Sequence, residues 1–167
     1  MRIFPAIGVA ALVFAIDQFS KWVVMEVLLL GRRSEFLEVG PFINLVLAYN
    51  RGVNFGLFSS SAAWQPFALA AFAGVVSLFL FIWAARTDDW RTSLGCGLAA
   101  GGALGNALDR LINGAVVDFI NMDCCGIGNP YAFNLADVGV FAGAAFIIWS
   151  TWTEGEPDPP PEAASDP

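Results

Sequence analysis

Residues 62–85 read AAWQPFALAAFAGVVSLFLFIWAA, an apolar stretch that contains no charged side chain. A helix that crosses a bilayer needs about 20 mostly apolar residues, so this stretch is long enough to span a membrane. Three further stretches have a similar character, and they run from Ile3 to Leu30, from Thr92 to Leu108 and from Phe133 to Trp152. We therefore predict a mainly α-helical integral membrane protein with four transmembrane helices.

The composition of the whole chain agrees with this prediction. Of its 167 residues, 57% are apolar and 14% are charged, and the mean hydropathy is +0.64. Soluble domains contain roughly 45–50% apolar and about 25% charged residues, so the composition excludes an ordinary soluble protein. The length fits one domain, which we place at residues 1–152.

The connection between the first two predicted spans, residues 31–61, has features of a small β-sheet. Phe36 to Val39 and Phe42 to Leu47 are similar to short strands, and Gly40-Pro41 between them is a turn signal. We predict a sheet at the membrane surface in this connection. The connection between the third and fourth spans, about residues 109–132, carries no strand prediction.

The last fifteen residues, 153–167, have a different composition from the rest of the chain. They contain five acidic residues, five prolines and no basic residue, which is typical of a disordered, solvated tail. The tail contributes −5 to the formal net charge of −7, so the remaining chain carries −2. Nucleic-acid binding requires a basic surface, and we predict no nucleic-acid partner.

The chain contains no histidine, which excludes a Ser-His-Asp triad, a Cys-His dyad and a histidine-ligated metal. Its three cysteines are Cys96, Cys124 and Cys125, and their spacing fits neither a disulfide framework nor a zinc site. We expect no metal and no cofactor. Because the chain has a single lysine, Lys21, carboxylates are the main catalytic groups that remain.

Ionisable residues within membrane spans are costly unless they are paired or line a wet cavity, so they are candidates for function. Asp17 and Lys21 are four residues apart and can form an ion pair on one helix face, for which we predict a structural role. Asn106, Asp109 and Arg110 share one face of the third span, where small residues allow close helix packing.

Two further carboxylates lie near span ends. Asp118 stands among apolar neighbours, and Asp137 follows Asn134 at the start of the fourth span. Two carboxylates at close range do not ionise together, which supplies an acid and a base in one site. This predicts either an aspartyl hydrolase or a proton-coupled carrier. A Ser-Lys protease that uses Lys21 and a non-enzymatic membrane assembly factor are further alternatives.

Five segments of the chain resemble the bacterial lipoprotein signal peptidases, also called signal peptidase II. The segments occur in the order and with the spacing of that family and cover nearly the whole chain except the tail. They are Asp17-Gln-Phe-Ser-Lys21, Asn50-Arg-Gly52 with Phe55, Gly102-Ala-Leu-Gly-Asn106-Ala-Leu-Asp109-Arg110, Val117-Asp118-Phe119-Ile120 and Phe133-Asn134-Leu-Ala-Asp137.

The resemblance implies a monomeric aspartyl endopeptidase of the bacterial inner membrane, with both termini in the cytoplasm and residues 31–61 forming an extracytoplasmic cradle. The substrate would be a diacylglyceryl-modified prolipoprotein, cleaved before its lipidated cysteine near the extracytoplasmic face, and the cyclic peptide globomycin would inhibit the enzyme. Asp118 and Asp137 match the catalytic pair. The residues that match the surrounding polar positions, which bind the substrate or support the site, are Asn50, Gly52, Asn106, Asp109, Arg110 and Asn134.

The chain departs from the family pattern at three places. Val53 and Asn54 occupy positions where the family often has small residues, which affects the expected shape of the substrate groove. Neither the adjacent pair Cys124 and Cys125 nor the acidic tail belongs to the family core.

Overall fold

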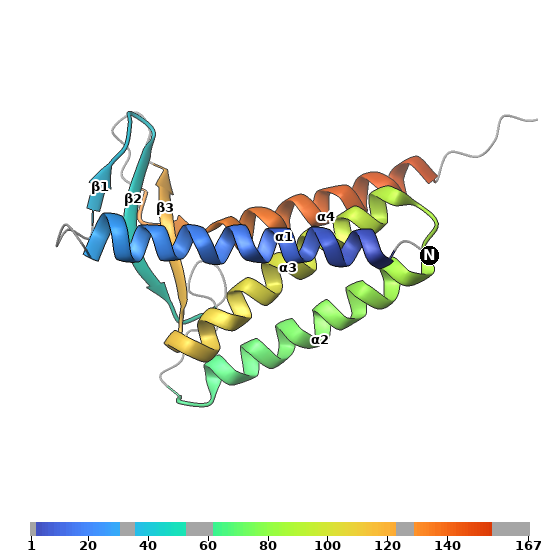
Figure 1. The fold of residues 1–167 in the computed structure, drawn as a ribbon, viewed down its shortest axis with the longest axis horizontal. Helices are drawn as coiled ribbons and strands as arrows, with labels where there is room; N and C mark the ends of the chain where they lie inside the picture. Colours follow the sequence, from blue (N-terminus) through green and yellow to red (C-terminus); the bar gives the residue numbers. More distant parts are fainter. Residues whose placement is uncertain (1–2, 31–35, 53–61, 123–128, 155–167) are drawn as a thin grey trace, which may run out of the picture.

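The structure is a computed structural model that describes residues 3–30, 36–52, 62–122 and 129–154. Four long α-helices lie side by side, and a four-stranded antiparallel sheet covers one end of the bundle (Figure 1). The helices are α1 (Ile3–Trp22), α2 (Gln65–Arg86), α3 (Trp90–Asn113) and α4 (Leu135–Glu154). α1 continues into π-helical turns, η1 (Val23–Leu30).

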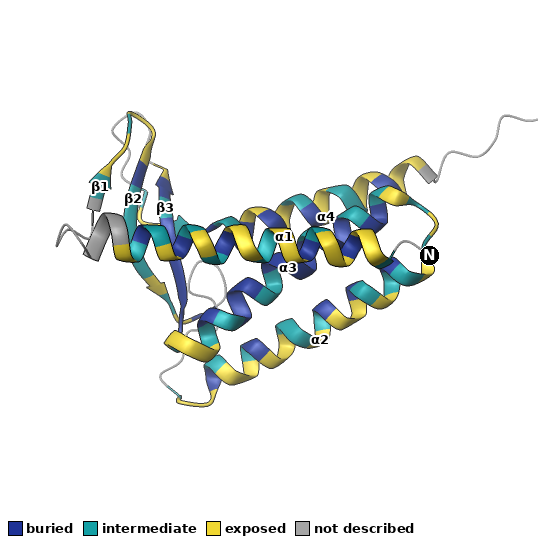
Figure 2. Cartoon of the chain, viewed as in Figure 1, coloured by how far each residue is buried: buried dark blue, intermediate teal, exposed yellow. Residues whose placement is uncertain are grey.

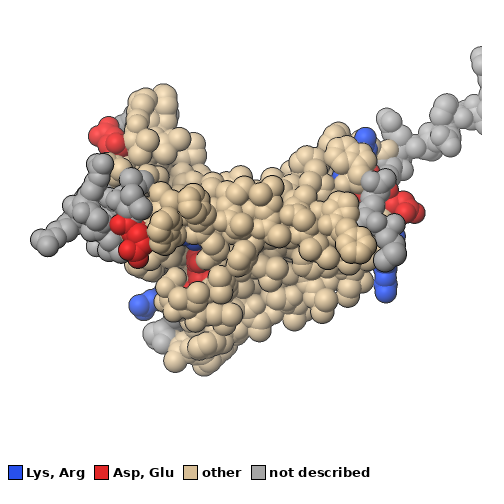
Figure 3. Space-filling view, viewed as in Figure 1, with Lys and Arg blue, Asp and Glu red and all other residues tan. Residues whose placement is uncertain are grey.

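Three of the helical segments are long and apolar enough to cross a membrane: Ile3–Glu26, Gln65–Arg86 and Leu135–Thr153. Their outward faces carry exposed apolar side chains, among them Leu12, Phe72 and Phe141 (Figure 2). Charged side chains gather at the two ends of the molecule, and the long middle zone is largely uncharged in Figure 3. An apolar belt between two charged ends is the surface of a protein that lies in a bilayer.

α3 contains the third predicted span but is not among the helices that meet this length and hydropathy criterion. It packs against each of the other three helices, and most of its length is lined with buried small residues. Glycines allow these close approaches: a side chain at Gly97 or Gly101 would meet the backbone of α1. On the opposite face of α3, a side chain at Gly102 would meet the carbonyl oxygen of Ala136 in α4.

We expect Gly102→Ala to lower the thermal stability of the purified protein in detergent. The added methyl group has no room beside the Ala136 carbonyl, so α3 and α4 must separate, and overpacking of this kind costs about 1–3 kcal/mol. Gly74→Ala in α2 is the matched control, because a methyl group there meets no atom within 4 Å. A melting temperature of Gly102→Ala equal to that of Gly74→Ala would contradict the packing.

At the end of the bundle away from the sheet, polar contacts fasten α3 to α4. Asp89 caps α3 by accepting a hydrogen bond from the backbone N–H of Thr92 at 3.0 Å, and it accepts another from the hydroxyl of the buried Ser150 in α4 at 2.5 Å. Partial burial acts to raise the pKa of Asp89, but these hydrogen bonds outweigh it and lower the pKa to about 2. The Arg91 guanidinium also stacks on the Trp149 ring, 4.7 Å from its centre.

The sheet contains the strands β1 (Phe36–Glu38), β2 (Ile43–Asn50), β3 (Val116–Met122) and β4 (Ala132–Phe133), in that order. The prediction placed the sheet entirely between the first two helices, and this is wrong for half of it, because β3 and β4 belong to the connection between α3 and α4. The reason is that Val116 to Phe119 are all buried, so β3 lacks the alternation of apolar and polar residues that marks a strand with one exposed face.

The turn between α3 and β3 brings the sheet onto the end of the bundle. Gly114 ends α3 with a positive φ of 68°, a conformation that glycine adopts without strain, and its N–H donates to the Arg110 carbonyl. The chain then reverses into β3, which pairs with β2 so that Asp118 lies opposite Ala48. This reversal brings β3 back beside the end of α3, where the Val117 N–H donates to Asp109 Oδ2 at 3.1 Å.

Two further boundaries differ from the predictions. Phe133 belongs to β4 rather than to the fourth span, and α4 continues to Glu154, two residues into the predicted tail. The rest of that tail, the positions Val53 and Asn54, and the pair Cys124 and Cys125 lie outside the described residues.

Candidate active site

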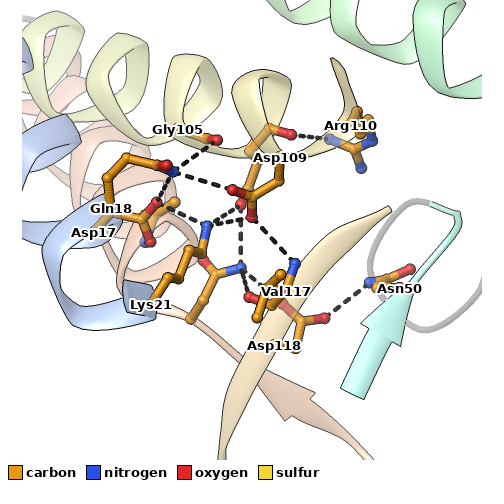
Figure 4. Close-up of polar contacts among 12 residues, drawn as sticks. Asp17, Gln18, Lys21, Asn50, Gly105, Asp109, Arg110, Val117 and Asp118 are labelled. Carbon is orange, nitrogen blue, oxygen red and sulfur yellow. Dashed lines mark hydrogen bonds and ion pairs between the residues drawn. The ribbon is translucent and has the colours of Figure 1, made fainter. Parts of the chain in front are cut away.

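Asp118 lies on β3 at the junction of the sheet and the helices, and its side chain is buried. One carboxylate oxygen, Oδ1, accepts a hydrogen bond from Asn134 Nδ2 at 2.7 Å. The other, Oδ2, accepts from Asn50 Nδ2 at 3.2 Å (Figure 4). Both donors are neutral side-chain amides.

Asp137 is buried in the first turn of α4, where the helix dipole favours a negative charge. Its Oδ1 accepts from Asn106 Nδ2 in α3 at 2.9 Å, and its Oδ2 accepts from the backbone N–H of Asn134 at 3.3 Å. Two N–H donors, one from each side, therefore hold this carboxyl group in place.

Asn134 joins the two carboxylates and is completely buried. Its Nδ2 donates to Asp118 and also lies 3.2 Å from the Val117 carbonyl and 3.1 Å from Asn106 Oδ1. Its Oδ1 accepts from the backbone N–H of Asp137 at 3.0 Å, so the same side chain caps α4. One asparagine therefore fixes the relative placement of Asp118 and Asp137.

The environment of Asp118 favours its protonated form. Burial raises the pKa of Asp118, the negative charge of Asp137 raises it further, and together they bring it to about 7 despite the opposing hydrogen bonds. A protonated carboxyl beside an ionised one supplies a proton donor and a proton acceptor at the same place, which is the requirement for general acid–base chemistry.

We expect the activity of the site to fall as the pH rises above about 7. Above this pH Asp118 loses its proton and can no longer serve as a proton donor, so the logarithm of the rate should decrease with a slope near −1. The measurement is the pH dependence of substrate cleavage in detergent, with stability followed in parallel. A rate that stays constant from pH 6 to pH 9 would contradict the assignment of a shared proton.

The predicted ion pair between Asp17 and Lys21 is present, with Lys21 Nζ 2.7 Å from Asp17 Oδ2. Lys21 also lies 2.8 Å from Asp109 Oδ2 in α3, and all three side chains are buried. Asp109 is therefore placed beside Lys21, whereas Asn106 from the same face of α3 reaches Asp137. Lys21 Nζ thus contacts two carboxylates and the amide oxygen of Asn106, whereas a Ser-Lys protease requires a contact with a serine hydroxyl.

Arg110 supports the turn that follows β2. Its guanidinium donates to the Gly52 carbonyl at 2.9 Å, while the Gly52 N–H donates to Asn50 Oδ1 at 3.0 Å. The second contact leaves Asn50 Nδ2 pointing at Asp118 (Figure 4). Of the residues predicted at this site, Asn50, Gly52, Asn106, Asp109, Arg110 and Asn134 all lie in one continuous network with Asp118 or Asp137.

Two glutamines in this network were missed by the sequence reasoning. Gln18 donates to Asp17 and to Asp109, both at 3.1 Å, and Gln65 at the start of α2 donates to the Arg51 carbonyl at 2.6 Å. Gln18 follows Asp17 in an apolar helix, and a polar side chain beside a buried carboxylate could have been predicted to contact it. Gln65 is a polar residue at a span end, which has no distinctive pattern.

A pocket of about 460 Å³ opens beside the carboxylates, between β4 and the first two turns of α4. Its wall is mostly apolar and includes Phe133, Val138 and Phe141, and Asp137 contributes the acidic group. An apolar pocket with one convergent polar group is typical of a ligand site. Among the described residues, no cluster of three or more His, Cys, Asp or Glu side chains has the arrangement of a metal site.

The apolar helices and the buried carboxyl pair beside a pocket define a membrane-embedded enzyme. The profile of the family described as Signal peptidase (SPase) II matches residues 9–153, and the chain belongs to this family. Its peptidase activity distinguishes the chain from the carrier and from the assembly factor that the residues alone left open.

Curated relatives support the same assignment. A lipoprotein signal peptidase of Rhodopseudomonas palustris is 40% identical over 147 residues, which cover 86% of this chain and 88% of the relative. A lipoprotein signal peptidase of Nitrobacter hamburgensis is 40% identical over 151 residues, covering 87% and 91%.

Two solved structures, each described as a bacterial membrane enzyme, have a similar fold. One has a TM-score of 0.75 at 26% identity and covers 95% of this chain and 94% of its own. The other has a TM-score of 0.69 at 28% identity and covers 90% and 97%.

Proposed function

We propose that this lipoprotein signal peptidase is an aspartyl endopeptidase in which Asp118 and Asp137 are the catalytic pair. The observation that carries the proposal is the hydrogen-bonded link through Asn134, which holds one carboxyl group with a raised pKa beside another at a helix N-terminus. Asp137 accepts a proton from the attacking water, and Asp118 polarises the scissile carbonyl and then donates its proton to the leaving amine.

The proposed substrate is a diacylglyceryl-modified prolipoprotein, cleaved before its lipidated cysteine. The apolar pocket beside Asp137 supports this choice, because each buried CH₂ group of an acyl chain contributes about 0.8 kcal/mol. Binding of the lipid places the adjacent peptide bond at the carboxylates, so that binding energy is used for orientation. The supporting roles proposed for Asn50, Gly52, Asn106, Asp109, Arg110 and Asn134 are to hold the catalytic pair and to bind the substrate backbone.

The proposed topology has four spans, with α3 as the additional one, and a single peptidase domain over residues 1–152. The enzyme acts as a monomer in the inner membrane, with the sheet and the site on the extracytoplasmic side and both termini in the cytoplasm. The test labels spheroplasts with a membrane-impermeant maleimide. The enzyme that they carry has its three native cysteines replaced, so that the introduced cysteine is the one labelled. Label should reach Val39→Cys in the sheet end and not Asp88→Cys in the link between α2 and α3, and the reverse pattern would overturn the orientation.

The function itself is tested by cleavage of a lipidated precursor in detergent. The purified enzyme should cleave the diacylglyceryl-modified precursor directly before the modified cysteine, and globomycin should block the reaction. The matched control is the same precursor with Cys→Ser at the modification site, which cannot accept the lipid. Equal cleavage of both precursors would exclude the proposed substrate class, and no cleavage of either would exclude the proposed function.

A further inference from the structure

A second buried charge cluster, formed by Asp17, Lys21 and Asp109, lies next to the carboxylates assigned to catalysis. Lys21 Nζ bridges Asp17 Oδ2 at 2.7 Å and Asp109 Oδ2 at 2.8 Å, which joins α1 to α3 (Figure 4). Burial of an amine and two carboxyl groups is costly, and removal of one partner leaves the others without compensation.

Each carboxylate of the cluster also holds one backbone N–H group outside it. Asp17 Oδ1 accepts from the N–H of Ala136 at 2.9 Å, and Ala136 immediately precedes Asp137. Asp109 Oδ2 accepts from the N–H of Val117 at 3.1 Å, and Val117 immediately precedes Asp118. The two tethers therefore hold the chain one residue before each catalytic carboxylate.

Lys21 has a third contact that reaches the site through a side chain. Its Nζ donates to Asn106 Oδ1 at 3.2 Å, and Asn106 Nδ2 donates to Asp137 Oδ1 at 2.9 Å. Because the oxygen of the Asn106 amide faces the ammonium group, its nitrogen must face Asp137. Lys21, together with Asn134 Nδ2 at 3.1 Å from the same oxygen, thus determines which way this amide points.

We propose that Lys21 is a positioning residue that fixes the separation of Asp118 and Asp137, by bridging the two carboxylates whose other contacts hold Val117 and Ala136. The proposal rests on the proposed function, since it takes Asp118 and Asp137 as the catalytic pair. Separation matters because two carboxyl groups share one proton only at close range. A displacement of about 1 Å in such a site can lower the rate roughly a hundredfold.

The experiment removes the bridge without changing the net charge. In the double variant Lys21→Met with Asp17→Asn, one positive and one negative charge are lost, and the amide introduced at position 17 can still accept from Ala136. Of the charged groups near the catalytic pair, Asp109 and Arg110 from α3 are unchanged, whereas the loss of Lys21 removes a charge that lowers the pKa of Asp118. We expect kcat on the lipidated precursor to fall roughly 10- to 100-fold while KM changes less than about threefold.

The pH profile separates positioning from a loss of folded protein. The profile is taken from Asp17→Asn alone, because this variant retains Lys21, whose charge lowers the pKa of Asp118. When the carboxylates of Asp118 and Asp137 move apart, their repulsion weakens, so the fall in rate at high pH should begin at a lower pH than in the wild type. Ser150→Ala is the matched control, because it removes a buried polar contact between α3 and α4 at the far end of the bundle. It should lower the melting temperature and leave the pH profile and the kcat of the folded enzyme unchanged.

Wild-type kcat in the double variant overturns the proposal. So does a loss of activity that only follows the loss of folded protein, together with a wild-type pH profile in Asp17→Asn. If the double variant does not fold, Asp17→Asn alone is measured, with a lower kcat at constant KM expected and a wild-type kcat again overturning it. Cleavage by the wild-type enzyme in the same assay is required first, so that a failure of the proposed function is recognised separately.

Discussion

Asp118→Asn and Asp137→Asn are each expected to abolish cleavage of the lipidated precursor, with a decrease in kcat of roughly 10⁴-fold or more. General acid–base groups of this kind contribute about 10²–10⁴-fold each, and an amide replaces neither the proton acceptor nor the acid.

Both variants should remain folded, and the contacts explain why. An amide at position 118 keeps one oxygen to accept from Asn134 or Asn50, and an amide at position 137 keeps one oxygen for Asn106. Each substitution therefore loses one hydrogen bond, worth about 1 kcal/mol. The measurement is the single-turnover cleavage rate together with the melting temperature in detergent.

Asp88→Asn is the matched control for these two variants. It makes the same chemical change at an exposed position in the link between α2 and α3, and it should leave the cleavage rate unchanged. Retained cleavage by purified Asp118→Asn or Asp137→Asn would remove the corresponding residue from the proposed mechanism.

The second large effect is expected for Asn134→Ala, with kcat reduced roughly a hundredfold. The amide of Asn134 joins Asp118 to the first turn of α4, and its removal leaves the Asp118 carboxyl and the Val117 carbonyl each without one buried donor. The carboxylates then lose their fixed relation, while the apolar pocket that we propose for the lipid is unchanged. KM should therefore change little.

Asn134 also caps α4, and a second variant separates the two roles. Asn134→Ser retains a hydroxyl that can cap the helix, but it has no amide to reach Asp118. We expect Asn134→Ala to lose about 1 kcal/mol of stability and Asn134→Ser to retain most of it, with low kcat in both. Wild-type kcat in Asn134→Ser would show that the amide does no more than cap the helix.

The helices were predictable from the sequence because a bilayer demands long apolar stretches, and Gln65–Arg86 meets that demand without a charge. The sheet was predictable only in part. β1 and β2 are separated by a recognisable turn, whereas β3 is buried on both faces and its sequence has no strand-like alternation. The burial of β3 removed the alternation by which a strand is recognised, and the same burial raises the pKa of Asp118.

The site shows the same division between local and distant contacts. Asn134 and Asp137 are three residues apart, so their proximity on one helix turn follows from the sequence. The contact between Asn50 and Asp118 spans 68 residues, and it depends on the register of β2 against β3, which no local pattern specifies. The tethers from Asp17 to Ala136 and from Asp109 to Val117 depend in the same way on how α1, α3 and α4 assemble.

The weak hydropathy of α3 has a consequence for how the enzyme is made. A helix rich in glycine and alanine gains little from lipid, and in the proposed four-span topology its contacts with α1, α2 and α4 would hold it in place. Asn106 and Asp109 travel with this helix, and Asp137 arrives only with the last one. Because α4 is the last helix in the chain, the proposed carboxylate pair is complete only when this helix has joined the others.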